Sequence, residues 1–165
     1  MDNKKLTTEE TFTLAVQNQQ KNNFQVAEKL YKETLKSNPN HVDAHNNLGI
    51  ILLRSGKSQK AKSCFEKAIE INPNNANAHN NLGVLFRQLG ELQKAISCHQ
   101  KAIEINPNNA NAHNNLGEVF RLLGELQKAK SCHQKAIEIN PNNAESHNNL
   151  GVIINELEEH QKAIS

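Results

Sequence analysis

The side chains best suited to chemistry in this sequence are eight histidines and three cysteines, and several of them recur at a fixed step. Cys64, Cys98 and Cys132 follow one another at intervals of 34 residues. Metal ligands must converge within ~2 Å of the ion, whereas equivalent positions on successive helix pairs are separated by roughly 10 Å. Cys98 and His99 are neighbours in sequence, so on a helix their side chains diverge by ~100° and do not form a nucleophile–base pair. We therefore expect no metal site and no disulfide, and we interpret the cysteines as packing residues.

Other catalytic signatures are absent from the 165 residues. The sequence contains no glycine-rich phosphate loop, no convergent pair of carboxylates and no nucleophile motif. We expect neither catalytic residues nor a cofactor within these residues, although a catalytic domain further along the gene product stays open.

The charge and hydropathy patterns argue against several classes of partner. The net charge is +2, and acidic and basic residues are interspersed, so there is no basic stripe for nucleic acid or for an anionic membrane. No apolar run approaches the ~20 residues that span a bilayer. The N-terminus lacks the apolar segment of a secretory signal, and three cysteines give no disulfide framework. These features predict a cytoplasmic protein that binds neither nucleic acid nor membranes.

The 34-residue step extends well beyond the cysteines, and it determines which elements position every side chain. It predicts a lead-in over residues 1–7, full repeats over 8–41, 42–75, 76–109 and 110–143, and a truncated repeat over 144–165. The residues that keep the step are a proline, an alanine and a His-Asn-Asn-Leu-Gly segment: Pro39, Pro73, Pro107 and Pro141; Ala27, Ala61, Ala95, Ala129 and Ala163; and the segments starting at His45, His79, His113 and His147.

Each repeat is predicted to form two helices joined by a tight turn. Before repeat 76–109, Asn74 and Asn75 supply N-cap side chains for a first helix over about residues 76–89. Gly90 then occupies the left-handed position that ends this helix, and a second helix follows over about 92–105. The second helix of repeat 144–165 is expected to begin and to reach only about a turn and a half. Thr7 with Glu10 predicts a capping box at the chain start, and the other left-handed positions are Asn22, Gly56 and Gly124.

A helical wheel divides the first helix of each repeat into two faces. In repeat 76–109 the packing face carries His79, Leu82, Gly83 and Phe86. Small residues such as Gly83 and Ala95 are expected to let the two helices approach closely. Four histidines are expected to be partly buried between helices, which predicts lower stability at acid pH: His79, His99, His113 and His133.

This pattern is similar to that of the tetratricopeptide repeat (TPR) family, in which a Leu-Gly pair, an aromatic residue, two alanines and a proline recur at fixed offsets. The resemblance covers residues 8–165. It implies an all-α fold, a right-handed α-solenoid of antiparallel helix pairs that forms a superhelix. The family's first-helix tryptophan is replaced by histidine in four repeats and by Thr11 in the first, and the second-helix aromatic residue becomes His99 and His133 in later repeats.

The resemblance also implies a protein–protein interaction scaffold, because TPR first helices line a concave groove that binds peptides. An asparagine ladder on this face suits the backbone of an extended peptide, and arginines at its edge suit an acidic group. The alternative is a solvated polar face that was copied during duplication. Family members that grip the C-terminal carboxylates of chaperones use Lys and Arg at positions that are Asn, Asp or Glu here, so we do not expect that activity. The predicted groove residues are Asn47, Asn81, Asn115, Asn149, Asn77, Asn111, Ile50, Val84, Arg54, Arg87 and Arg121.

A second function stays open at this point. The asparagine ladder resembles that of O-linked N-acetylglucosamine transferases, which implies a substrate-presenting arm at the N-terminus of a longer glycosyltransferase, sulfotransferase or methyltransferase. The truncated last repeat is expected to leave an apolar face without most of its cover, which favours either a longer chain or self-association through this end. The residues of this face are Leu150, Ile153, Ile154 and Leu157.

Overall fold

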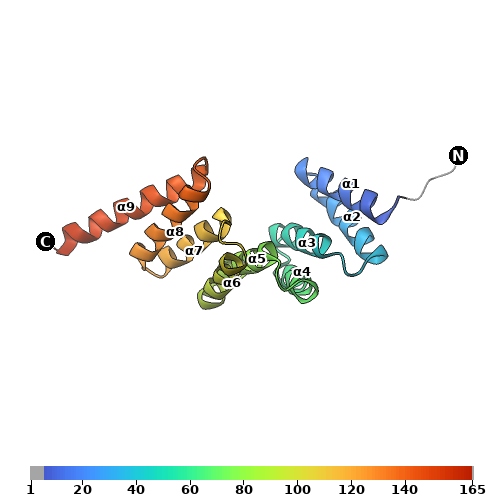
Figure 1. Cartoon of the computed structure of the whole chain (residues 1–165), viewed down its shortest axis with the longest axis horizontal. Coiled ribbons are helices and arrows are strands. Elements are labelled where there is room, and N and C mark those ends of the chain that lie inside the picture. Colours follow the sequence, from blue (N-terminus) through green and yellow to red (C-terminus); the bar gives the residue numbers. More distant parts are fainter. Residues whose placement is uncertain (1–5, 165) are drawn as a thin grey trace. The chain divides into compact units, whose positions relative to one another are not determined.

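The computed structural model of the chain describes residues 6–164, and it is built from α-helices throughout this range (Figure 1). The all-α helical-repeat fold expected from the sequence is confirmed. The helices are α1 (Thr8–Gln20), α2 (Phe24–Ser37), α3 (Val42–Arg54), α4 (Ser58–Ile71), α5 (Ala76–Gln88), α6 (Leu92–Ile105), α7 (Ala110–Leu122), α8 (Leu126–Ile139) and α9 (Ala144–Ile164).

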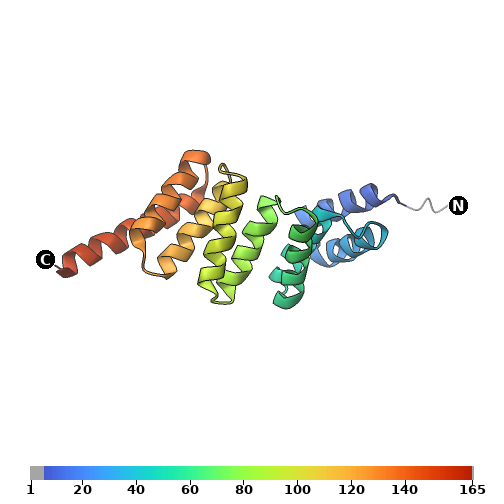
Figure 2. The same cartoon turned by 60° about the horizontal axis from the view of Figure 1, so that its bottom comes forward.

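The chain divides into two compact units, Met1–Asn81 and Leu82–Ser165, and the division falls inside α5. In the first unit α1 packs on α2, α2 on α3 and α3 on α4. In the second unit α6 packs on α7, α7 on α8 and α8 on α9. Consecutive helices are joined by short turns and therefore form antiparallel hairpins, which Figure 2 shows from a second direction. No helix within residues 6–164 is long and apolar enough to cross a membrane.

The turns inside the hairpins have the backbone conformation that the sequence predicts. Gly56, Gly90 and Gly124 have φ values of +72°, +75° and +74°, and Asn22 has a φ of 61°. Asparagine tolerates this left-handed conformation better than most residues with a Cβ. The predicted turn between the first and second helix is therefore confirmed in four hairpins.

Side-chain caps fix where the first helices begin. Thr7 and Glu10 form the predicted capping box, in which Glu10 Oε2 accepts from Thr7 N at 2.8 Å. Asn75 Oδ1 accepts from Ala78 N at 2.9 Å, as its position predicts. In repeat 42–75 the cap is His41, whose Nδ1 accepts from the third residue of α3 at 3.2 Å. These bonds satisfy backbone N–H groups that have no partner inside the helix.

The prediction of a second helix inside residues 144–165 is wrong, because α9 continues without a break from Ala144 to Ile164. Glu158 occupies the position that Gly124 holds one repeat earlier. Glutamate is a strong helix former and does not favour the left-handed conformation that would end the helix, so the helix continues.

The apolar face of α9 is better covered than the sequence suggested. Ile153 is fully buried and packs with Leu126 and Ala129 of α8. Ile154 of the same face, in contrast, is 38% exposed. Packing against α8 therefore covers the centre of this face and leaves its margins in solvent.

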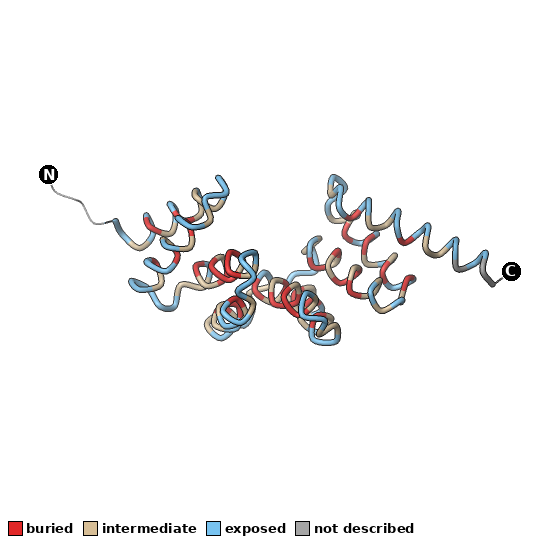
Figure 3. Tube along the Cα trace, turned by 180° about the vertical axis from the view of Figure 1, so that it is seen from behind, coloured by how far each residue is buried: buried red, intermediate tan, exposed pale blue. Residues whose placement is uncertain are grey.

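The close approach of the two helices in a hairpin depends on a glycine facing a ring. A Cβ on Gly83 would lie 2.6 Å from Cε1 of His99, and one on Gly49 would lie 2.5 Å from Cε1 of Phe65. The sequence predicted a close approach of Gly83 and Ala95, but the side chain nearest to the glycine is the ring of His99. Figure 3 shows the buried positions recurring along the helices, and they include polar residues as well as alanines and leucines.

Candidate functional site

Two neighbouring rows of asparagines run along the first helices, and the structure assigns them different environments. The row predicted to line the groove, Asn47, Asn81, Asn115 and Asn149, is half-buried. The other row consists of the preceding residue in each repeat, and three of its four members are buried. Asn46, Asn80 and Asn114 are buried, with Asn114 only 3% exposed, and Asn148 alone is exposed. The buried row points toward neighbouring helices, which a single-helix wheel does not include.

The two rows are hydrogen-bonded to each other across successive repeats. In the first unit Asn81 Nδ2 donates to Asn46 Oδ1 at 2.9 Å. In the second unit Asn149 Nδ2 donates to Asn114 Oδ1 at 3.2 Å. Each of these bonds uses one of the two N–H groups of the half-buried amide. The groove row is therefore partly structural, which neither a free ligand-binding ladder nor a solvated polar face describes completely.

Asn114 is the centre of a buried polar cluster. Its Oδ1 also accepts from His133 Nδ1 at 3.0 Å and from Ser146 Oγ at 3.1 Å. Because an amide oxygen only accepts, Nδ1 of His133 carries a proton in this arrangement. Burial lowers the pKa of His133, and the neighbouring Glu118 opposes that shift. This cluster was not predicted from the sequence, although asparagine is disfavoured inside helices and its recurrence was the available signal.

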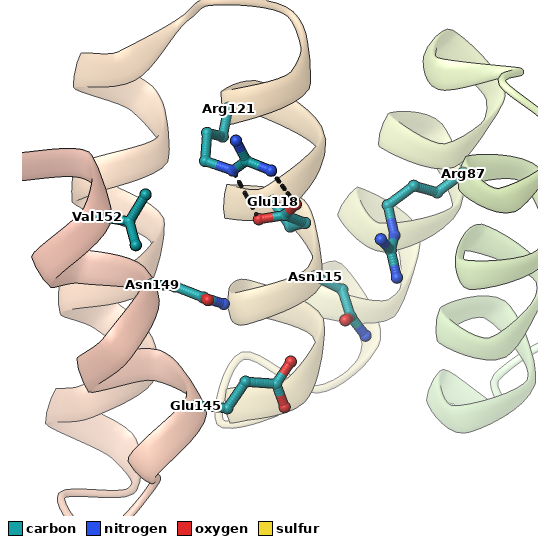
Figure 4. Close-up of a pocket in the computed structure, with 7 residues that line it drawn as sticks. All are labelled: Arg87, Asn115, Glu118, Arg121, Glu145, Asn149 and Val152. Carbon is teal, nitrogen blue, oxygen red and sulfur yellow. Dashed lines mark hydrogen bonds and ion pairs between the residues drawn. The ribbon is translucent and has the colours of Figure 1, made fainter. Parts of the chain in front are cut away.

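The second unit contains a hollow of about 360 Å³ on the face of its first helices (Figure 4). Its lining comes from α5, α7 and α9, the first helices of three consecutive repeats. Four predicted groove residues meet there, together with two glutamates and a valine that the same face carries. The lining residues are Arg87, Asn115, Glu118, Arg121, Glu145, Asn149 and Val152.

The two arginines of this hollow differ in their partners. Arg121 binds Glu118 through two hydrogen bonds, Nε to Oε2 at 3.0 Å and Nη2 to Oε1 at 2.7 Å. Its Nη1 also lies 3.5 Å from Oε1 of Glu156. The hydrogen bond to Glu118 raises the pKa of Arg121, and the same bond lowers the pKa of Glu118. Arg121 is thus already paired within the chain, and its predicted contact with an acidic ligand would require an internal partner to be displaced.

Arg87 makes neither a hydrogen bond nor an ion pair with any residue that the structure describes, and its Nε is buried without an acceptor. The spacing of Glu118 and Arg121, three residues apart on one helix, was the sequence signal for the different state of Arg121.

The remaining predicted groove residues lie outside this hollow. Asn111 and Asn77 are exposed near the starts of α7 and α5, and Val84 and Ile50 are half-buried. Arg54 lies over the ring of Phe24, with its guanidinium carbon 4.4 Å from the ring centroid.

The cysteines have the environment of packing residues. All three are free thiols that are partly buried. Burial raises the pKa of both Cys98 and Cys132 to about 11, which keeps these thiols protonated and poorly nucleophilic near neutral pH. Within the described part of the chain, no group of three or more His, Cys, Asp or Glu side chains is arranged to hold a metal ion.

Comparisons with solved structures agree with this architecture. The crystal structure of MamA is 28% identical, with a TM-score of 0.73 over 91% of this chain and 88% of that one. The first TPR of Spaghetti (RPAP3), bound to the HSP90 peptide SRMEEVD, is 25% identical, with a TM-score of 0.67 over 70% of this chain and 92% of that one. A structure of pilF from Pseudomonas aeruginosa shares the fold at 20% identity, with a TM-score of 0.84 over 92% of this chain and 69% of that one.

Comparison with curated proteins finds no match. A family model described as tetratricopeptide repeat matches residues 43–108 and 74–142, and two further models with the same description match residues 13–61 and 134–165. The chain belongs to the tetratricopeptide repeat family.

Proposed function

We propose that this chain is a protein-interaction scaffold that binds an extended peptide segment on the face of its first helices. The observation that carries the proposal is the hollow of the second unit, where three consecutive first helices contribute amide, charged and apolar side chains to one concave surface. The TPR domain of RPAP3, which is similar to this chain, is bound to an HSP90 peptide, and this supports a peptide as the ligand class.

The chemistry of the lining suits a peptide backbone. Asn115 and Asn149 present amide groups, which can donate to a carbonyl oxygen and accept from an N–H whatever side chains the peptide carries. Val152 is 46% exposed and gives the ligand an apolar contact that is otherwise left in water.

A C-terminal carboxylate is a poorer candidate for this surface than an internal segment. Carboxylate recognition in the family depends on several cations at inner positions, and of the two arginines in this hollow Arg121 is occupied by Glu118 and Glu156, which leaves Arg87 alone. The second function raised by the sequence, a substrate-presenting arm of a larger transferase, would use the same face and stays a prediction.

Selection from a library of displayed unstructured peptides against the intact chain tests the proposal. Val152→Lys places a charge in the hollow and should weaken the affinity for the selected peptides by about tenfold. The reason is that the apolar contact is lost and a lysine is partly desolvated. Gln134→Lys adds the same charge at an exposed position of α8 and should change affinity by less than about twofold. Equal binding to both variants would place the ligand elsewhere and contradict the proposal.

A further inference from the structure

Some charged side chains of the hollow have ion-pair partners within the described part of the chain, whereas others have none there. This difference bears on which peptides the hollow binds, and the inference rests on the proposed function. We propose that the hollow selects peptide segments that carry both an acidic and a basic side chain, with the acidic group placed at Arg87 and the basic group at Glu145.

At one end of the hollow lies Arg87, whose guanidinium is available to an acceptor on the ligand. Its guanidinium lines the hollow, and it has no hydrogen bond or ion pair with the residues that the structure describes. Its Nε is buried, so a carboxylate in the hollow would contact the Nη end of the guanidinium. A carboxylate also matches the fork geometry of a guanidinium, so two parallel hydrogen bonds are available.

The other cation of the hollow does not compete for the same acidic group. Arg121 is held by two hydrogen bonds to Glu118, and Glu156 lies against its third nitrogen. A ligand carboxylate at Arg121 would therefore have to displace an internal partner, whereas one at Arg87 displaces none. The acidic preference of the site should depend on Arg87.

Glu145 lies at the other end of the hollow. It lines the hollow from the first turn of α9, is exposed, and has no ion pair among the described residues. Arg121 is paired with Glu118, which leaves Arg87 on α5 and Glu145 on α9 as the lining charges that have no ion pair among the described residues. Figure 4 shows Arg87 and Glu145 entering from different helices, with the amide of Asn115 between them. A segment that matches this charge order gains from both ends, and a segment with the reversed order is repelled at both.

The proposal is tested with the full chain and labelled octapeptides that are blocked at both ends. Each peptide carries one Asp and one Lys on a Gly-Ser background, separated by one to four residues and placed in both orders. Matched peptides carry Asn for Asp or Gln for Lys. Binding is measured by fluorescence anisotropy at low ionic strength, where charge interactions are least screened.

The best Asp/Lys peptide should bind about tenfold more tightly than its Asn or Gln counterpart, and this advantage should fall in high salt. Arg87→Gln should abolish the preference for Asp over Asn, and Glu145→Gln should abolish the preference for Lys over Gln. Arg87→Glu should reverse the first preference, so that a Lys is favoured over an Asp at this end of the bound peptide. Lys101→Gln and Glu138→Gln remove the same charges from exposed positions on α6 and α8 and should leave both preferences intact. Thermal melting of each variant checks that the fold is retained.

The outcomes separate this inference from the function on which it rests. Peptides that bind regardless of charge, and that are weakened by Val152→Lys, would overturn the charge rule while supporting peptide binding on this face. A charge preference that persists in Arg87→Gln and Glu145→Gln would also overturn the rule. If displayed and synthetic peptides all fail to bind the folded chain, the proposed function fails together with the inference.

Discussion

Gly83 faces the imidazole ring of His99 so closely that a Cβ on the glycine would lie 2.6 Å from Cε1 of the ring. Gly117 and His133 repeat the relationship, with a distance of 2.8 Å. In these hairpins the ring of the second helix therefore lies directly on the backbone of the first. The hairpin has no room for a methyl group at the glycine unless the ring or the helix moves.

Gly83→Ala should lower the free energy of unfolding by about 1–3 kcal/mol, because the added methyl overpacks the hairpin. Gly151 stands at the same position of α9, where a Cβ meets nothing within 4 Å. Gly151→Ala should instead stabilise the chain by about 0.5–1 kcal/mol through helix propensity alone. Urea unfolding of the two variants measures both effects. If Gly83→Ala is as stable as the original chain, the ring is not fixed against the glycine.

Asn114→Ala should destabilise the chain by about 2–4 kcal/mol, because three donors lose their common acceptor inside the protein. Those donors are His133 Nδ1, Ser146 Oγ and Asn149 Nδ2. Asn148 is the equivalent residue in α9 but is exposed, so Asn148→Ala should change stability by about 0.5 kcal/mol or less. Thermal or urea unfolding distinguishes the two, and equal losses would mean that the buried cluster contributes little.

Acid should destabilise the chain between pH 7.5 and 5. Burial, with a smaller effect of Arg87, lowers the pKa of His99 from 6.5 to about 4. A histidine whose folded pKa is depressed is neutral in both states above pH 6.5, and as the pH falls toward 4 the unfolded chain takes up the proton first. For His99 alone this removes about 2 kcal/mol of stability at pH 5. Urea unfolding at the two pH values measures the difference.

His99→Phe is the variant that isolates this effect, because Phe65 occupies the same position one repeat earlier. It should reduce the loss of stability between pH 7.5 and 5 by about 2 kcal/mol, whatever it does to stability at neutral pH. The converse change, Phe65→His, should increase that loss. An unchanged pH dependence in both variants would assign the acid sensitivity to other groups.

Gly124→Ala should cost about 1–2 kcal/mol, because alanine is disfavoured at a φ of +74°. A Cβ at this position meets nothing within 4 Å, so the cost is one of backbone conformation and not of packing. Gly124→Asn should cost clearly less, since Asn22 adopts the same conformation in the first hairpin. Comparison of the two variants by thermal unfolding tests the ranking, and it would be refuted by equal destabilisation.

Local rules determined most of the fold, and the positions where they failed have identifiable causes. The helix that starts at Leu92 and the left-handed turn at Gly90 follow from capping and turn residues within a few positions of each. The continuation of α9 was missed because repeat spacing outweighed Glu158, whose helix propensity pointed the other way. At this position the local signal was correct and the periodic one was wrong.

The candidate site was less predictable because it depends on contacts between repeats. A helical wheel correctly placed Arg87 and Arg121 near one face, but it contains no information on which arginine has a partner. Likewise, the burial of Asn114 results from His133 on α8 and from Ser146 and Asn149 on α9, which approach it only in the folded array. Side-chain pairing over 32 or 35 residues is a tertiary property that one helix does not encode.

The asparagine pairs that join successive repeats also bear on how such an array changes length. Asn46 of repeat 42–75 accepts from Asn81 of the repeat that follows, and Asn114 of repeat 110–143 accepts from Asn149, so in both pairs the partners are 35 residues apart. Duplication or loss of a whole 34-residue unit keeps the 35-residue spacing of such a pair, whereas an insertion of any other length between the partners changes it. During evolution of the array, these asparagine pairs therefore favour the gain or loss of whole repeats over insertions of other lengths.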